Sequence, residues 1–251
     1  MIQKIQNPKK DNQDIPKQFL EHLLEIRLRL LIYILTLVIT SIISFYFYPL
    51  ILRFMLLPLN QKLFFTSPAG GLDLMIKLSL LSGFIFSLPM FLYQLLRFIE
   101  PALSKNISLK IITIIVSSFA LTILGLSFAY LIGLPAALYF LSSFGSDQIQ
   151  SLITTNEYFT FVSRYLLGFA LFFQLPLIIF FINEFYKISV STLLKFQKIV
   201  IVLSLIVAAI LTPTPDFLNQ IIMASPLIVL YYFSIAVIHF SNRHIDSKSL
   251  T

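Results

Sequence analysis

The stretch Phe19–Leu30, FLEHLLEIRLRL, carries five ionisable side chains directly ahead of a run that has no charge. In a helix, Glu25 and Arg29 lie four residues apart on one face, with the acid N-terminal to the base, the favourable order for an ion pair. Residues 30–52 then contain no Asp, Glu, Lys or Arg, and about 20 apolar residues suffice to cross a bilayer. The stretch predicts a charged helical turn at a membrane surface, which orients the first span and presents a carboxylate there.

The composition places most of the protein surface in lipid. The chain has 251 residues, of which 58% are hydrophobic and 12% charged, whereas soluble domains carry about 25% charged residues. Cysteine is absent, which excludes disulfides and thiolate sites. The three histidines lack the spacing of metal ligands, so we expect no cofactor. No basic face with interleaved aromatic residues is evident, so we expect no nucleic-acid partner.

Uncharged runs predict an all-α polytopic membrane protein with six transmembrane helices. The runs are residues 30–52, 78–96, 111–146, 165–183, 199–215 and 217–242. We expect spans at about 29–50, 75–97, 109–133, 160–184, 197–212 and 217–238. They form one membrane domain over residues 19–240, with a polar tail at 1–18 and a second tail at 241–251.

Proline and glycine positions predict kinked helices and a concave assembly. Gly133 and Pro135 predict that the third helix breaks or ends there. The fifth run closes on Pro213-Thr214-Pro215, so spans five and six are expected to be short and joined by a tight turn. Proline is also common in membrane helices generally, which is the alternative interpretation. The residues to which we assign structural roles are Pro58, Lys77, Pro89, Pro135 and Pro176.

Basic residues predict the orientation. With six spans, both tails lie on one side of the membrane, and that side then holds 14 of the 18 Lys and Arg. Because basic residues concentrate in cytoplasmic loops, both termini are predicted to be cytoplasmic. The connections at 49–75 and 134–159 then face outward. The four basic residues on the opposite side are Arg53, Lys62, Lys77 and Arg164.

Several local patterns, in one order along the chain, resemble the TatC family, the multi-spanning core of the twin-arginine protein translocase. The patterns are His22-Leu-Leu-Glu25-Ile-Arg27-Leu-Arg29-Leu30; Ser67-Pro68 followed by Lys77; Pro89, Tyr93-Gln94, Phe98 and Pro101-Ala102-Leu103; Phe128-Ala129-Tyr130 with Pro135-Ala136; Phe169 through Gln174-Leu175-Pro176; and Leu211 through Asp216, with Gln220 and Pro226-Leu227.

The resemblance implies a receptor without covalent chemistry, and therefore not an enzyme. Such proteins bind the twin-arginine signal peptides of folded precursors at the cytoplasmic face of the cell inner membrane. They recruit single-span TatA- and TatB-type subunits, and the proton-motive force drives export. The resemblance also implies self-association within a receptor complex. The sequence does not exclude an organellar membrane as the alternative.

The resemblance assigns signal-peptide binding to Glu25, because a guanidinium pair needs a carboxylate. The alternative is an internal pair with Arg29. Arg27 either orients Glu25 or follows the positive-inside rule. In the loop after span two, the family often has an acid where Ile107 stands here, and Glu100 either replaces that acid or is a solvated charge. The remaining residues assigned to this site are Phe98, Pro101, Leu103 and Lys105.

Three polar residues are candidates for contact with partner subunits. Gln174 lies in the middle of span four, where a polar side chain needs a partner. It either contacts a partner helix or forms an internal hydrogen bond. Asp216 and Gln220 are four residues apart at the start of span six and form a polar patch, although Asp216 also suits a helix N-cap.

Two other classes of protein compete with this interpretation. A six-span secondary transporter of a small solute requires ionisable residues near the bilayer midplane and two related halves, and neither is visible. A membrane-embedded hydrolase requires a Ser–His pair, a metal cluster or paired acids within the spans. His239 is the histidine nearest to a span centre, and it lies close to the end of the last span.

Overall fold

The computed structural model describes residues 14–59, 62–99, 111–142, 153–211 and 217–248. Most of these residues are helical, and within them we find no β-strand, only one isolated bridge between Phe64 and Thr154. The helices are α1 (Asp14–Tyr46), α2 (Tyr48–Leu56), α3 (Gly70–Ile99), α4 (Ile111–Phe128), a π-helical segment (Ala129–Gly133), α5 (Leu134–Ser142), α6 (Thr155–Phe172), α7 (Leu175–Tyr186), α8 (Val190–Leu211) and α9 (Phe217–Lys248).

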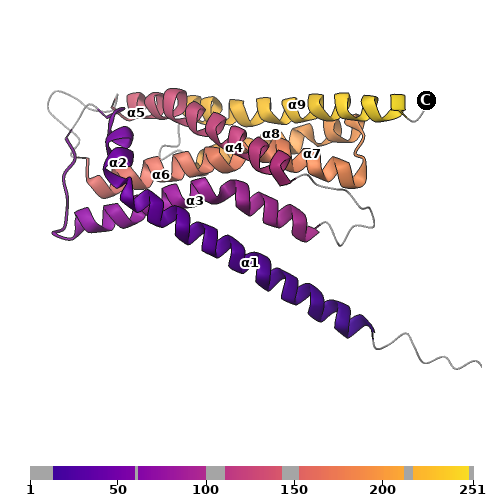
Figure 1. Ribbon diagram of the computed structural model, residues 1–251. Helices are drawn as coiled ribbons and strands as arrows, with labels where there is room; N and C mark the ends of the chain where they lie inside the picture. The colour runs from indigo at the N-terminus through magenta and orange to yellow at the C-terminus, as the bar shows by residue number, and fades with distance from the viewer. Residues whose placement is uncertain (1–13, 60–61, 100–110, 143–152, 212–216, 249–251) are drawn as a thin grey trace, which may run out of the picture.

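The six predicted spans are confirmed. The apolar stretches long enough to cross a membrane are Leu24–Tyr46, Gly70–Phe98, Ile112–Tyr139, Thr155–Glu184, Val190–Ile210 and Gln220–Phe240. In Figure 1, the start of α1 and the end of α9 lie at the same end of the molecule, here called the terminal end. The short helix α2 and helix α5 lie at the opposite end, here called the distal end.

Helix α1 packs antiparallel on α3 through small residues. The Tyr33 ring lies 5.1 Å from the Phe91 ring, and the Thr40 hydroxyl donates to the Gly83 carbonyl at 2.8 Å. A Cβ atom at Gly83 would lie 2.6 Å from the Cα atom of Ser41, so only glycine allows the two backbones to approach this closely. Toward the terminal end, α1 diverges from α3 (Figure 1).

The third and fourth spans each depart from regular α-helix just before a proline. Span three remains continuous through the π-helical segment Ala129–Gly133 and proceeds as α5, in which Pro135 is the second residue. The helix is thus widened, not ended, near Gly133. Span four breaks between α6 and α7, and Pro176 is the second residue of α7, a position where its missing N–H group costs nothing.

Pro226 shows how a proline inside a span is accommodated. It lies within α9 and cannot donate to the carbonyl four residues earlier, that of Ile222. The Ser225 hydroxyl donates to this carbonyl at 2.9 Å. A neighbouring side chain therefore satisfies the group that proline leaves without a donor, as lipid surroundings require.

Two tyrosines hold α2 against the distal end of the bundle. The Tyr130 hydroxyl donates to the Phe54 carbonyl at 2.7 Å, and the Tyr158 hydroxyl donates to the Met55 carbonyl at the same distance. The Tyr130 ring also stacks on that of Phe54, with centroids 4.1 Å apart. The last carbonyls of a helix have no partner within the helix, so spans three and four supply donors that fix the position of α2.

Spans five and six are the two shortest, at 21 residues each. Helix α8 nevertheless begins at Val190, seven residues before the predicted start of span five. Lys195 and Lys198 are exposed on its first turns, where long side chains can extend toward water without ending the helix. Its 22 residues correspond to about 33 Å, which is enough to cross a bilayer.

Candidate functional site

Glu25 lies on α1 near the terminal end and is paired with Arg29, which is the internal pair that the sequence analysis left open as the alternative to signal-peptide binding. The Arg29 Nε atom donates to Glu25 Oε1 at 3.2 Å, and Nη2 donates to the same oxygen. The Glu25 side chain is 35% exposed and that of Arg29 is 18% exposed. The carboxylate is therefore accessible from the surface and already in contact with a guanidinium. Arg27 is exposed on another face of the helix.

The register between α1 and α3 fixes the level of Glu25 in the bundle. Tyr33 lies opposite Phe91. Eight residues further toward the terminal end, about 12 Å along each axis, are Glu25 on α1 and Ile99 on α3. Phe98, which is half-buried, lies at this level too. The carboxylate is thus level with the point where the second-to-third connection leaves α3.

Much of the predicted site lies outside the described residues. Glu100, Pro101, Leu103 and Lys105 belong to that connection, and Asp216 belongs to the connection between α8 and α9. Their roles stay predictions. The structure places Glu25, Arg27 and Phe98 at one end of the molecule.

Gln174 occupies a buried polar cluster between spans three and four. It is 2% exposed. The Ser118 hydroxyl donates to Gln174 Oε1 at 2.9 Å, and Gln174 Nε2 donates to Thr122 Oγ1 at 2.9 Å. Nε2 also lies 3.3 Å from the Ala170 carbonyl oxygen. This geometry matches the internal hydrogen bond that the sequence left open, and contact with a partner helix stays a prediction.

Gln220 joins the last two spans. Its Nε2 atom donates to the Leu205 carbonyl of α8 at 2.9 Å, and the residue is half-buried. Within the described residues, this side chain contributes to packing of α8 against α9. Whether it also contacts a partner subunit stays a prediction.

A buried asparagine at the terminal end was missed by the sequence reasoning. Asn183 is 0% exposed. Its Nδ2 atom donates to Asn242 Oδ1 at 3.0 Å, and its Oδ1 atom accepts from the Ile188 backbone N–H at 2.9 Å. The contact closes the turn at Lys187, whose φ of 47° is left-handed. The signal available was an amide residue at the last position of the uncharged run 165–183.

Lys77, to which the sequence analysis assigns a structural role, contacts side chains of two helices. Its Nζ atom lies 2.7 Å from Asp73 Oδ2 on α3 and donates to Asn156 Oδ1 on α6 at 3.0 Å. It therefore ties spans two and four together at the distal end. Pro89 is buried within α3, Pro135 is exposed, and Pro58 follows the end of α2.

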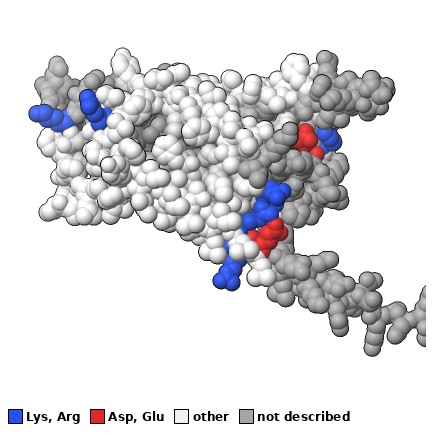
Figure 2. Space-filling view, viewed as in Figure 1, with Lys and Arg blue, Asp and Glu red and all other residues white. Residues whose placement is uncertain are grey.

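Charged side chains are few among the described residues, and the acidic ones are scattered. In the part of the chain that the structure describes, no three His, Asp or Glu residues lie close enough to hold a metal ion. Figure 2 shows charged side chains at the two ends of the molecule, with an uncharged band between them. This pattern suits a multi-pass membrane protein.

Comparisons with known proteins identify the family. Residues 21–226 match the family described as Sec-independent protein translocase protein (TatC). The chain is 36% identical over 222 residues to the Sec-independent protein translocase protein TatC of Aquifex aeolicus (strain VF5), covering 86% of this chain and 92% of that protein. It is 30% identical over 226 residues to the uncharacterized tatC-like protein ycf43 of Porphyra purpurea, covering 90% and 89% of the two chains.

Solved structures agree with these relatives. A crystal structure of the twin-arginine translocase receptor TatC in DDM superposes with a TM-score of 0.76 at 35% identity, covering 86% of this chain and 98% of that chain. A second crystal structure of the same receptor gives a TM-score of 0.72 and covers 88% and 99%. The sequence, the six spans and the fold lead to one conclusion: this chain belongs to the TatC family of Sec-independent protein translocase proteins.

Proposed function

We propose that this chain is a twin-arginine receptor, which docks the signal peptides of folded precursors on Glu25 at the terminal end. The observation that carries the proposal is the contact between Glu25 and the Arg29 guanidinium. An incoming arginine offers the same planar donor group and competes with Arg29 for the carboxylate. The pair is partly exposed, so this exchange requires no unfolding of the bundle.

The family supports this assignment. Members are protein translocase components, not enzymes, and the solved relative is described as a twin-arginine translocase receptor. Arginine is distinguished from lysine at such a site because a planar fork can bind a carboxylate through two parallel hydrogen bonds, whereas an ammonium acts as a point charge. In our proposal, Phe98, Pro101, Leu103 and Lys105 complete the docking surface around Glu25, and Glu100 supplies a second carboxylate.

The proposal includes an orientation and partners. Both termini lie in the cytoplasm, as the distribution of basic residues favours, so that Glu25 meets precursors before transport. Single-span TatA- and TatB-type subunits then join through the polar positions Gln174, Asp216 and Gln220, and the proton-motive force drives passage. For Gln174, this implies that a partner helix displaces the bonds to Ser118 and Thr122.

Co-purification tests the proposal. The full chain, in a membrane that also contains the single-span subunits, is isolated together with a twin-arginine precursor or with the same precursor carrying two lysines. We expect capture of the arginine form and a loss of capture with the lysine form. Equal capture of both forms would contradict arginine recognition.

A further inference from the structure

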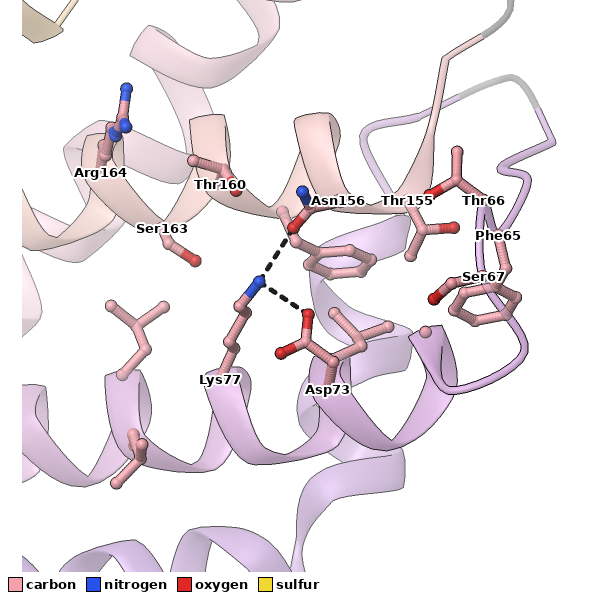
Figure 3. Close-up of a pocket in the computed structure, with 15 residues that line it drawn as sticks. Phe65, Thr66, Ser67, Asp73, Lys77, Thr155, Asn156, Thr160, Ser163 and Arg164 are labelled. Atoms are coloured by element: carbon pink, nitrogen blue, oxygen red, sulfur yellow. Dashed lines mark hydrogen bonds and ion pairs between the residues drawn. The ribbon is translucent and has the colours of Figure 1, made fainter.

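A pocket of about 400 Å³ with charged and polar groups in a partly apolar lining lies between α3 and α6 at the distal end (Figure 3). Two basic residues, Lys77 on α3 and Arg164 on α6, line it together with the acid Asp73. The side chains of Asn156, Thr160 and Ser163, and others at its outer end, add amide and hydroxyl groups. Asp73, Lys77 and Asn156 meet between the two helices, whereas the Arg164 side chain lies at the rim and points away from α3 (Figure 3). Contact of Arg164 with a ligand bound at Lys77 therefore requires a change of its rotamer.

The depth of the two basic residues indicates what the pocket meets. Lys77 immediately precedes the uncharged run 78–96, and Arg164 immediately precedes the uncharged run 165–183. Each run of 19 residues corresponds to about 28 Å of helix, which matches the hydrocarbon thickness of a bilayer. If these uncharged runs span the hydrocarbon layer, both cations lie near its boundary on the side opposite the two termini, within the first three turns of the longer apolar stretches Gly70–Phe98 and Thr155–Glu184.

The pocket has one more positive than negative group among its lining residues. Lys77 is bound to Asp73 at 2.7 Å and to Asn156 at 3.0 Å. Arg164 is exposed at the rim and makes no hydrogen bond or ion pair with the other residues drawn in Figure 3. A guanidinium at the edge of the hydrocarbon layer favours an anionic partner because water screens it less there than in bulk.

A second polar group in the lining also lacks a partner. The Thr155 side chain is 5% exposed, and its hydroxyl has no hydrogen-bond partner within the described residues. A buried hydroxyl without a partner costs free energy. The hydroxyl oxygen is itself buried, so a ligand in the cavity reaches it only if the lining shifts.

We propose that this pocket binds the headgroup of an anionic glycerophospholipid. Arg164 and Lys77 contact the phosphodiester, and the hydroxyl and amide groups of the lining contact the alcohol that follows it. The single excess positive charge matches a headgroup with one net negative charge and disfavours a zwitterionic one. Because Lys77 also ties α3 to α6, an occupied site stabilises the distal end of spans two and four.

Native mass spectrometry of the purified full chain tests this site. The protein is equilibrated with equal amounts of phosphatidylglycerol and phosphatidylcholine, and the bound lipids are counted for the wild type and for Arg164→Gln. A basic residue near a membrane surface contributes about a fivefold preference for anionic lipid, so we expect Arg164→Gln to lower phosphatidylglycerol occupancy about fivefold. Arg164→Lys should retain most of the binding.

The matched control is Arg53→Gln. Arg53 is exposed in the last turn of α2 at the same end, but it does not line this pocket, so its removal should lower phosphatidylglycerol occupancy much less than Arg164→Gln does. Equal loss in both variants, or no loss in Arg164→Gln, would overturn the proposal. Full displacement of the lipid by millimolar inorganic phosphate or glycerol 3-phosphate would also overturn it, in favour of a soluble phosphate ligand.

A second variant covers the other cation. Lys77→Gln also removes contacts that join two helices, so the melting temperature of each protein is compared with itself, in detergent without added lipid and again with phosphatidylglycerol. We expect the lipid to raise the melting temperature of the wild type, and to raise that of the double variant Arg164→Gln/Lys77→Gln much less. An equal rise in both proteins would contradict a site built on these two residues.

Discussion

Replacing Glu25 with glutamine removes one negative charge and nearly preserves side-chain size. In the structure, the carboxylate is 35% exposed and its partner Arg29 is four residues away on the same helix. Exposed pairs of this kind contribute about 0.3–0.5 kcal/mol. We therefore expect the Glu25→Gln variant to insert and fold normally, with a loss of unfolding free energy well below about 1 kcal/mol.

The effect on docking should be much larger. A hydrogen bond to a charged group contributes about 1.5–3 kcal/mol, and each 1.4 kcal/mol corresponds to a tenfold change in affinity. Loss of one such bond with a signal-peptide arginine thus predicts that Kd rises about 10- to 100-fold. Arg29 competes with the peptide for this carboxylate, which places the expected change toward the lower end of that range.

The assay is titration of a fluorescent twin-arginine signal peptide into the full chain in lipid nanodiscs. Glu184→Gln is the matched control, because Glu184 is an acid of α7, near the same end of the molecule, that has no predicted role in docking. Glu25→Gln should also erase the preference for a twin-arginine over a twin-lysine peptide. A Kd within twofold of the wild type, or an equal loss in Glu184→Gln, would refute the reasoning.

Three further changes test the packing. Gly83→Val should destabilise the crossing of α1 and α3 by about 1–3 kcal/mol, which a lower melting temperature would show. The control Gly71→Ala should change the melting temperature little, because its added Cβ would meet its nearest neighbour only at 4.0 Å; equal effects of the two variants would contradict the close contact at Gly83. Gln174→Leu should lower the free energy of unfolding by about 1–3 kcal/mol, because it leaves the Ser118 hydroxyl without its acceptor. The same variant should weaken capture of single-span subunits more than peptide docking, and equal loss of both would count against a partner contact at Gln174. Tyr130→Phe removes the hydrogen bond to the Phe54 carbonyl, so it should lower the free energy of unfolding by about 1 kcal/mol and speed hydrogen exchange in α2. Unchanged exchange would mean that this hydrogen bond does not hold the helix.

The number of spans and the pair at Glu25 could be predicted from the sequence because both depend on local patterns. An uncharged run of about 20 residues has few alternatives to a membrane helix, and an acid four residues before a base on a helix meets it without help from distant residues. The start of α8 could not be predicted in this way. Lys195 precedes the predicted start at residue 197, but its exposed side chain, like that of Lys198, is compatible with a position inside a helix at the membrane edge.

Contacts between spans were harder to predict. That Gln174 needs a partner follows from its place in an apolar span, but the identity of that partner depends on which face of span three packs against it. Ser118 and Thr122 are four residues apart and share a face, yet nothing local connects them to Gln174. The widened turn at Ala129–Gly133 likewise depends on tertiary packing, for a Cβ at Gly133 would lie 2.8 Å from Cε1 of Tyr165.

Site-directed crosslinking tests the docking of signal peptides at the Glu25 end most directly. The chain has no cysteine, so any disulfide crosslink must form at the single cysteine that is introduced. Leu24 and Leu72 are both well exposed, at 57% and 66%, and lie at the terminal and distal ends. With a twin-arginine peptide that carries one cysteine beside its arginines, we predict a disulfide crosslink to Leu24→Cys and none to Leu72→Cys. Crosslinking to Leu72→Cys alone would contradict the account.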